Sequence, residues 1–251
     1  FGPSPRERRI ARSCLAPLGM PPSVARKRPA SEAEHPPAKR AAAHRLLRPE
    51  DLMGGSAFDG RLDADGSLLR YEPSFASPGE ARQWLAALQG GLAWEQGSVK
   101  LFGKQLPEPR LTCYYGDPGL AYTYTGRTVR PHPWSECPTL ELIRRRVEGA
   151  TGARFNTVLC NRYRGGNDCM GLHADDEAVY GPAPTIASLS LGAERDFDIR
   201  LRQGTARHRI SLRSGSLLVM AGRMQDFWKH GVPRRKRVTE ERINLTFRRI
   251  V

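Results

Sequence analysis

The sequence predicts an α+β protein that is mainly β, with two helices ahead of a dense block of short strands. Two observations support this: apolar residues recur at helical spacing in two segments before residue 152, and six runs after it alternate with period two. Strands of this length, separated by Gly, Pro or charged turns, favour a sandwich or jelly roll whose interior can hold a ligand. With 251 residues, 39% of them hydrophobic, the chain can build one sizeable core.

Residues 1–49 are predicted to be a disordered basic tail. They carry eleven Lys or Arg against three Glu, a net +8 of the chain's +14, and nine of its twenty prolines. Few large apolar residues are present to offset the entropy lost on folding. Two basic clusters between Arg26 and Arg40 have the pattern of a two-part nuclear import signal, so we expect the nucleus. The alternative is a solvated basic tail on a cytoplasmic protein.

The remaining net charge of about +6 lies in residues 50–251, so the basic balance extends beyond the tail and favours a polyanionic partner. No apolar run approaches the length needed to span a membrane.

The two predicted helices share their start signals. The first follows Ser77 and Pro78 and ends at a Gly pair, and the second starts at Pro138. Their apolar faces consist of Ala81, Trp84, Leu85 and Leu88 in the first, and Leu140, Ile143 and Val147 in the second. The predicted strands are FNTVLCNRY, TIASLSLG, DFDIRLR, HRISL, SLLVMAG and RINLTFRRI.

A candidate metal site lies in the segment GLHADDE. If the chain is extended there, His173 and Asp175 point to one face. A third ligand must come from elsewhere, and His230 is the candidate. Two histidines and one carboxylate form the facial triad of non-haem iron(II) oxygenases. The H-x-D pair alone is a weak signal, and a packed or surface histidine is the alternative.

The last predicted strand adds a second signal. Arg242 and Arg248 share one face with Asn244 and Thr246, whereas Ile243, Leu245 and Phe247 share the other. If the polar face is interior, its guanidinium groups need anions, and a dicarboxylate offers a bidentate partner. The alternative is an exposed edge strand whose basic stripe binds nucleic acid.

Five ordered blocks, NRYRGGNDCMGLHADDE, PTIASLSLGAERDF, GSLLVMAG, HGVP and RINLTFR, resemble the AlkB family of iron(II)- and 2-oxoglutarate-dependent nucleic-acid dealkylases. The upstream segment LFGKQLPEPRLTCYYGDPGLAYTYTG resembles the family's duplex-DNA repair branch. The resemblance implies a double-stranded β-helix, or jelly roll, spanning residues 50–251 as one domain. A nucleotide-recognition lid would occupy about residues 95–135, and we expect a monomer.

The resemblance also implies the cofactors and their contacts. Iron(II) would be held by His173, Asp175 and His230, with dioxygen and the co-substrate 2-oxoglutarate as reactants. The residues implied for 2-oxoglutarate are Asn161, Tyr163, Arg242, Asn244 and Arg248.

The implied reaction is oxidative demethylation of 1-methyladenine and 3-methylcytosine in DNA, which releases formaldehyde, succinate and carbon dioxide. Duplex and single-stranded DNA are both expected substrates, and RNA is a further candidate. Alternatives are an RNA demethylase or a protein hydroxylase of the same fold, and a DNA-binding module without catalytic activity.

A base inside a duplex must be flipped to reach a buried metal. The resemblance places Tyr122 and Tyr124 along the base pocket, with Tyr124 stacking opposite His173, and Asp176 at the exocyclic amino group of the base. The alternatives are an ordinary aromatic strand and a solvated loop acid.

The segment SVKLFGK predicts the device that opens the duplex. Phe102, followed by Gly103, would fill the gap left by a flipped base, while Lys104 and Arg110 hold phosphates. The alternative is a hairpin whose Phe packs inward.

Overall fold

The computed structural model describes residues 58–61, 66–101, 104–124 and 127–251. The predicted tail at residues 1–49 lies outside this part of the chain. Within the described ranges, no helix is both long and apolar enough to cross a membrane.

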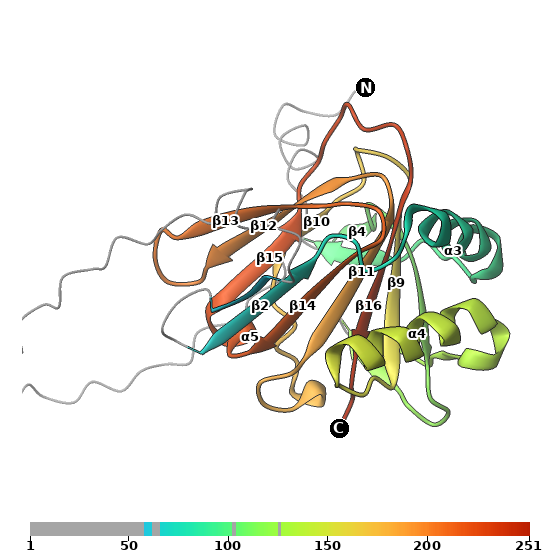
Figure 1. The fold of residues 1–251 in the computed structure, drawn as a ribbon, viewed down its shortest axis with the longest axis horizontal. Helices are drawn as coiled ribbons and strands as arrows, with labels where there is room; N and C mark the ends of the chain where they lie inside the picture. Colours follow the sequence, from blue (N-terminus) through green and yellow to red (C-terminus); the bar gives the residue numbers. More distant parts are fainter. Residues whose placement is uncertain (1–57, 62–65, 102–103, 125–126) are drawn as a thin grey trace, which may run out of the picture.

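Two β-sheets form the body of the protein (Figure 1). The eight-stranded sheet has the order β1 (Phe58–Arg61), β2 (Ser67–Glu72), β14 (Ser216–Gly222), β11 (Ile186–Gly192), β16 (Arg242–Arg248), β9 (Thr157–Tyr163), β5 (Leu111–Gly116) and β8 (His132–Pro133). The four-stranded sheet has the order β10 (Met170–His173), β15 (Trp228–Val232), β12 (Arg195–Leu201) and β13 (Arg207–Leu212). Neighbouring strands are mostly distant in sequence, as in a jelly roll. The predicted fold class is confirmed.

Two helices cover the outer face of the large sheet (Figure 1). Helix α3 (Pro78–Gly91) begins with a capping box, in which Ser77 and Glu80 satisfy each other's backbone N–H groups. Helix α4 (Pro138–Thr151) packs beside it, and Arg146 of α4 joins the two by pairing with Glu80. Both predicted helices are confirmed, and their apolar faces form one core with the sheet.

A second core lies between the two sheets. It includes Leu218 and Met220 from the large sheet, and Phe197, Ile199 and Trp228 from the small one. This core holds the sheets face to face.

Strand β16 places apolar side chains on one face of the large sheet and polar side chains on the other. Ile243, Leu245 and Phe247 are fully buried in the core beneath the helices. The alternate residues, from Arg242 to Arg248, point toward the small sheet and are also buried. Because β16 lies between β11 and β9, the alternative of an exposed edge strand is wrong.

The β-structure is more widely distributed along the chain than the sequence pattern predicted. Among the described residues, strands β1 and β2 precede helix α3, and strands β3 to β8 lie between α3 and α4. Short helical turns are η1 (Trp134–Glu136), η2 (Ala178–Tyr180) and α5 (Met224–Phe227).

The segment predicted as a lid spans about residues 95–135. It contains two hairpins, β3 (Ser98–Leu101) with β4 (Lys104–Pro107) and β6 (Tyr122–Tyr124) with β7 (Arg127–Val129). Strands β5 and β8 from the same segment belong to the large sheet, so the hairpins are anchored directly to it.

Replacing the cap residue should measure the contribution of the capping box. We expect Ser77→Ala to lower the free energy of unfolding by about 1 kcal/mol, because the N–H of Glu80 loses its acceptor. Urea unfolding of this variant and of the exposed control Ser74→Ala would test it. An equal loss in both variants would contradict the capping role.

Candidate functional site

Two histidines face each other across a strand pair in the small sheet. His173 ends β10, His230 lies in the middle of β15, and the two are direct partners in the antiparallel ladder. Their ring centroids are 4.4 Å apart. Gly231 permits this approach, since a Cβ there would lie 2.8 Å from the carbonyl oxygen of Met170. The glycine that follows His230 therefore allows β15 to lie close enough to β10 for the two histidines to be aligned.

Asp175 joins them from the loop after β10. Its Oδ1 lies 3.7 Å from Nε2 of His173, and its Oδ2 lies 3.8 Å from Nε2 of His230. The guanidinium of Arg248 donates to Oδ1 at 2.9 Å. Burial alone would raise the pKa of Asp175, but Arg248 and the two imidazoles lower it to about 2. The carboxylate is therefore ionised at neutral pH.

The three side chains fit a divalent metal ion. Their potential ligand atoms all lie within 4.8 Å of one another. Oδ2 of Asp175 is buried and has no hydrogen-bond partner within the described part of the chain. Nδ1 of His173 lies 2.9 Å from the carbonyl of Gly171, which directs its Nε2 toward the cluster. Burial lowers the pKa of His230 to about 3, so its imidazole is neutral, the form that binds metals.

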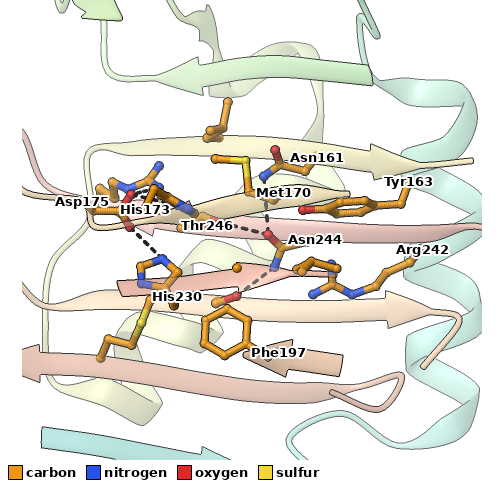
Figure 2. A pocket seen from close by; sticks show the side chains of 16 residues that line it. Asn161, Tyr163, Met170, His173, Asp175, Phe197, His230, Arg242, Asn244 and Thr246 are labelled. Carbon is orange, nitrogen blue, oxygen red and sulfur yellow. Dashed lines mark hydrogen bonds and ion pairs between the residues drawn. The ribbon is translucent and has the colours of Figure 1, made fainter. Parts of the chain in front are cut away.

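The pocket extends from this cluster to a buried arginine (Figure 2). Arg242 is 1% exposed, and its Nη2 donates to the hydroxyl of Ser190 at 2.9 Å. Its Nε and Nη1 have no hydrogen-bond partner among the described residues. The ring of Tyr163 lies 5.1 Å from its guanidinium carbon. Burial lowers the pKa of Arg242 to about 10, so the group stays charged and requires an anion.

Amides line the wall between the two ends of the pocket, as Figure 2 shows. The side chain of Asn244 donates to Ser188 at 2.8 Å and accepts from Thr246 at 2.9 Å. Asn161 lies beside it, with its amide nitrogen 3.4 Å from the Asn244 oxygen. All five residues predicted for 2-oxoglutarate, namely Asn161, Tyr163, Arg242, Asn244 and Arg248, line this pocket.

Arg110, predicted as an exposed cation beside the hairpin, is placed differently. It is 5% exposed, donates to Oδ1 of Asn161 at 2.8 Å and pairs with Glu108 at 3.2 Å. Glu108 and Arg110 lie in the bend between β4 and β5, where the chain brings their side chains together. Arg110 thus supports Asn161, which lines the pocket. Lys104 is exposed.

The other predicted substrate residues either do not line the pocket or lie outside the described part of the chain. The Asp176 side chain is 52% exposed and pairs with Arg202 at 2.5 Å. Tyr122 and Tyr124 are placed on β6, but only their backbone is described. Phe102 and Gly103 lie outside the described residues.

Sequence reasoning missed three buried contributors to the site. Ser190 contacts Arg242, Phe197 stacks on His230 with centroids 5.2 Å apart, and Gln225 binds the backbone of Asp175. The alternation in IASLSLG places its serines on the polar face and could have revealed Ser190. No pattern marks Gln225, which acts on a backbone group.

Comparison with known proteins decides the family. The profile of the 2OG-Fe(II) oxygenase superfamily matches residues 69–248. The chain belongs to this superfamily. DNA oxidative demethylase ALKBH2 of Mus musculus is 43% identical over 76% of this chain and 83% of that protein. The Bos taurus protein of the same name is 40% identical over 76% of this chain and 72% of that protein.

These relatives place the chain in the AlkB branch of the superfamily, as the sequence blocks indicated. The superfamily's requirements, iron(II), 2-oxoglutarate and dioxygen, suit the His–Asp–His cluster and confirm the predicted cofactors. The solved structure of OsALKBH1 shares the fold with a TM-score of 0.52 at 16% identity, covering 77% of this chain and 100% of that one.

Removing the unpaired cation should weaken co-substrate binding. We expect Arg242→Ala to weaken the binding free energy of 2-oxoglutarate by about 2 to 5 kcal/mol, because a buried carboxylate loses its charged partner. The dissociation constant should rise roughly thirtyfold or more. Calorimetric titration without oxygen would measure it, with the exposed Arg223→Ala as control. Unchanged affinity in Arg242→Ala would mean that the anion binds elsewhere.

Proposed function

We propose that this protein is a DNA repair enzyme that removes N-methyl groups from 1-methyladenine and 3-methylcytosine by oxidation. The observation that carries this proposal is a single pocket with a His–Asp–His cluster at one end and an unpaired buried arginine at the other. A dicarboxylate is the ligand that can meet a metal and a guanidinium at the same time. Relatives that are 40% and 43% identical to this chain are named DNA oxidative demethylases.

Each pocket residue then has a defined task. His173, Asp175 and His230 would hold iron(II), and three protein ligands leave positions open for the co-substrate and dioxygen. Arg242 would bind the distal carboxylate of 2-oxoglutarate, with Tyr163 and Asn244 fixing its orientation. Iron(II) with 2-oxoglutarate and dioxygen supplies the oxidising chemistry that hydroxylates an N-methyl group, with succinate, carbon dioxide and finally formaldehyde as products.

Arg248 has a separate task in this arrangement. Its contact with Oδ1 of Asp175 leaves Oδ2 as the oxygen without a hydrogen-bond partner. We infer that Arg248 keeps the carboxylate ionised and turned so that Oδ2 is available to the metal.

The two hairpins flanking β5 are the proposed substrate-binding elements. Strands β3 and β4 pair as far as Leu101 and Lys104, so residues 102 and 103 are the link between them. We propose that Phe102 replaces the flipped base in the duplex, that Tyr122 and Tyr124 of β6 line the base pocket, and that Asp176 binds the exocyclic amino group. The amino group would compete there with Arg202.

A direct assay separates this function from the alternatives. Methylated duplex DNA, single-stranded DNA, RNA and a peptide mixture would each be incubated with iron(II), ascorbate and 2-oxoglutarate and examined by mass spectrometry. We expect mass loss of one methylene equivalent from methylated DNA, with succinate formed in equal amount. Turnover on RNA alone would favour an RNA demethylase, and turnover on peptides alone a protein hydroxylase. Absence of succinate with every substrate would favour a non-catalytic binding module.

Loss of the proposed carboxylate ligand should separate catalysis from binding. We expect Asp175→Ala to abolish demethylation while DNA affinity changes less than about threefold, since the basic surface is retained. The exposed control Asp226→Ala should keep full activity. Substantial demethylation by Asp175→Ala would exclude this residue as a ligand.

The proposed wedge residue should matter only where a base pair must be opened. We expect Phe102→Ala to slow repair of methylated duplex by about tenfold or more, on the order of 1.4 kcal/mol in the barrier. Repair of the same lesion in single-stranded DNA should change little, because an unpaired base costs less to extrude. Single-turnover rates on both substrates and a melting curve test this. Equal slowing on both, or a large drop in melting temperature, would show that Phe102 is a core residue.

We also propose a nuclear location and a monomeric state. Deleting residues 1–49 should spare catalysis on short oligonucleotides and reduce nuclear accumulation, because both basic clusters of the import pattern are lost. Fluorescence microscopy of fusions too large to diffuse through nuclear pores would test the location. Continued nuclear accumulation of the truncated fusion would exclude the tail as the signal.

Light scattering of the purified protein would test the proposed monomeric state.

A further inference from the structure

The backbone of Asp175 depends on a side chain from a different part of the chain. The ladder between β10 and β15 has its last pair at His173 and His230, so the strand offers Asp175 no ladder partner. Its N–H instead donates to Oε1 of Gln225 at 3.0 Å. Gln225 is 2% exposed and belongs to α5, a single helical turn directly before β15.

The orientation of the Gln225 amide is determined by its surroundings. Nε2 lies 3.9 Å from the sulfur of Met220, a weak acceptor, and Met220 lines the pocket. With the amide reversed, an N–H group would face the N–H of Asp175. The buried amide can therefore satisfy Asp175 in only one of its two orientations.

This contact fixes the backbone from which the carboxylate projects. Asp175 must hold its carboxylate near both histidines and Arg248, while the next residue, Asp176, turns outward to 52% exposure. Without an acceptor, a buried N–H costs about 1 to 3 kcal/mol, which would favour a shift of the loop toward water.

We propose that Gln225 is a positioning residue for the metal centre, acting through the backbone of Asp175. Gln225 is not among the residues that line the pocket. The inference rests on the proposed role of Asp175 as a ligand and adds a residue outside the triad to the determinants of metal affinity. Partners of this kind typically change metal affinity by about 10- to 100-fold when they are removed.

Metal affinity without turnover provides the first test. The dissociation constant of the metal-free full-length protein for Mn(II) would be measured from the electron paramagnetic resonance signal of the free ion. Gln225→Met fills a similar volume without an acceptor oxygen, whereas Gln225→Glu retains one. Met224→Leu is the matched control, because Met224 is the buried neighbour on the same turn and does not bind Asp175. Asp175→Ala is the reference for loss of the ligand itself.

We expect Gln225→Met to weaken Mn(II) binding about 10- to 100-fold, with Gln225→Glu and Met224→Leu within about threefold of wild type. Wild-type affinity in Gln225→Met, or an equal loss in Met224→Leu, would overturn the proposal. If Asp175→Ala also binds Mn(II) like wild type, the ligand assignment itself fails. A loss in Asp175→Ala with none in Gln225→Met refutes only the role of Gln225.

Amide hydrogen exchange provides a second test that needs no metal. In the metal-free protein, the Asp175 amide should exchange about tenfold or more faster in Gln225→Met than in wild type, since its hydrogen bond is lost. Amides of strand β16 should be unchanged, which separates this local effect from unfolding. Unchanged exchange at Asp175 would contradict the contact on which the proposal rests.

Discussion

The site depends on an imbalance of buried charge. Strand β16 directs two arginines into the interior between the sheets, and Asp175 is the acid that pairs with Arg248 there. Arg242 at the other end forms no ion pair among the described residues. Because a buried guanidinium without an anion is costly, we propose that a carboxylate of 2-oxoglutarate is the partner of Arg242. In that arrangement, the position of Arg242 would determine where the far end of the co-substrate lies.

The core of the fold could be predicted from the sequence because its signals are local. The alternation in RINLTFR, the short apolar run in SLLVMAG and the Ser–Pro start of helix α3 each depend on a few neighbouring residues. The strands β5, β10 and β15 were harder to detect. All of β10 is partly buried, and most residues of β15 and β5 are buried, so no alternation with period two appears in these strands.

The sequence predicted the site residues whose side chains point into the same pocket. His173, Asp175 and His230 carry their chemistry in their residue types, and the family blocks supplied their grouping. The burial of Arg110 had no local signal, because its partner Asn161 is 51 residues away in sequence. Gln225 left no signal at all, since its partner is a backbone N–H that any residue at position 175 would present.

The ion pair between Arg248 and Asp175 lowers the free-energy cost of bringing the three ligand side chains together. A buried carboxylate without a partner would be costly. Here Arg248 donates to Oδ1 of Asp175 and burial keeps the His230 imidazole neutral, so the three side chains gather without a pair of like charges. We therefore expect a chelator to lower the stability of this protein less than that of small metalloproteins whose folding free energy is largely metal-binding free energy.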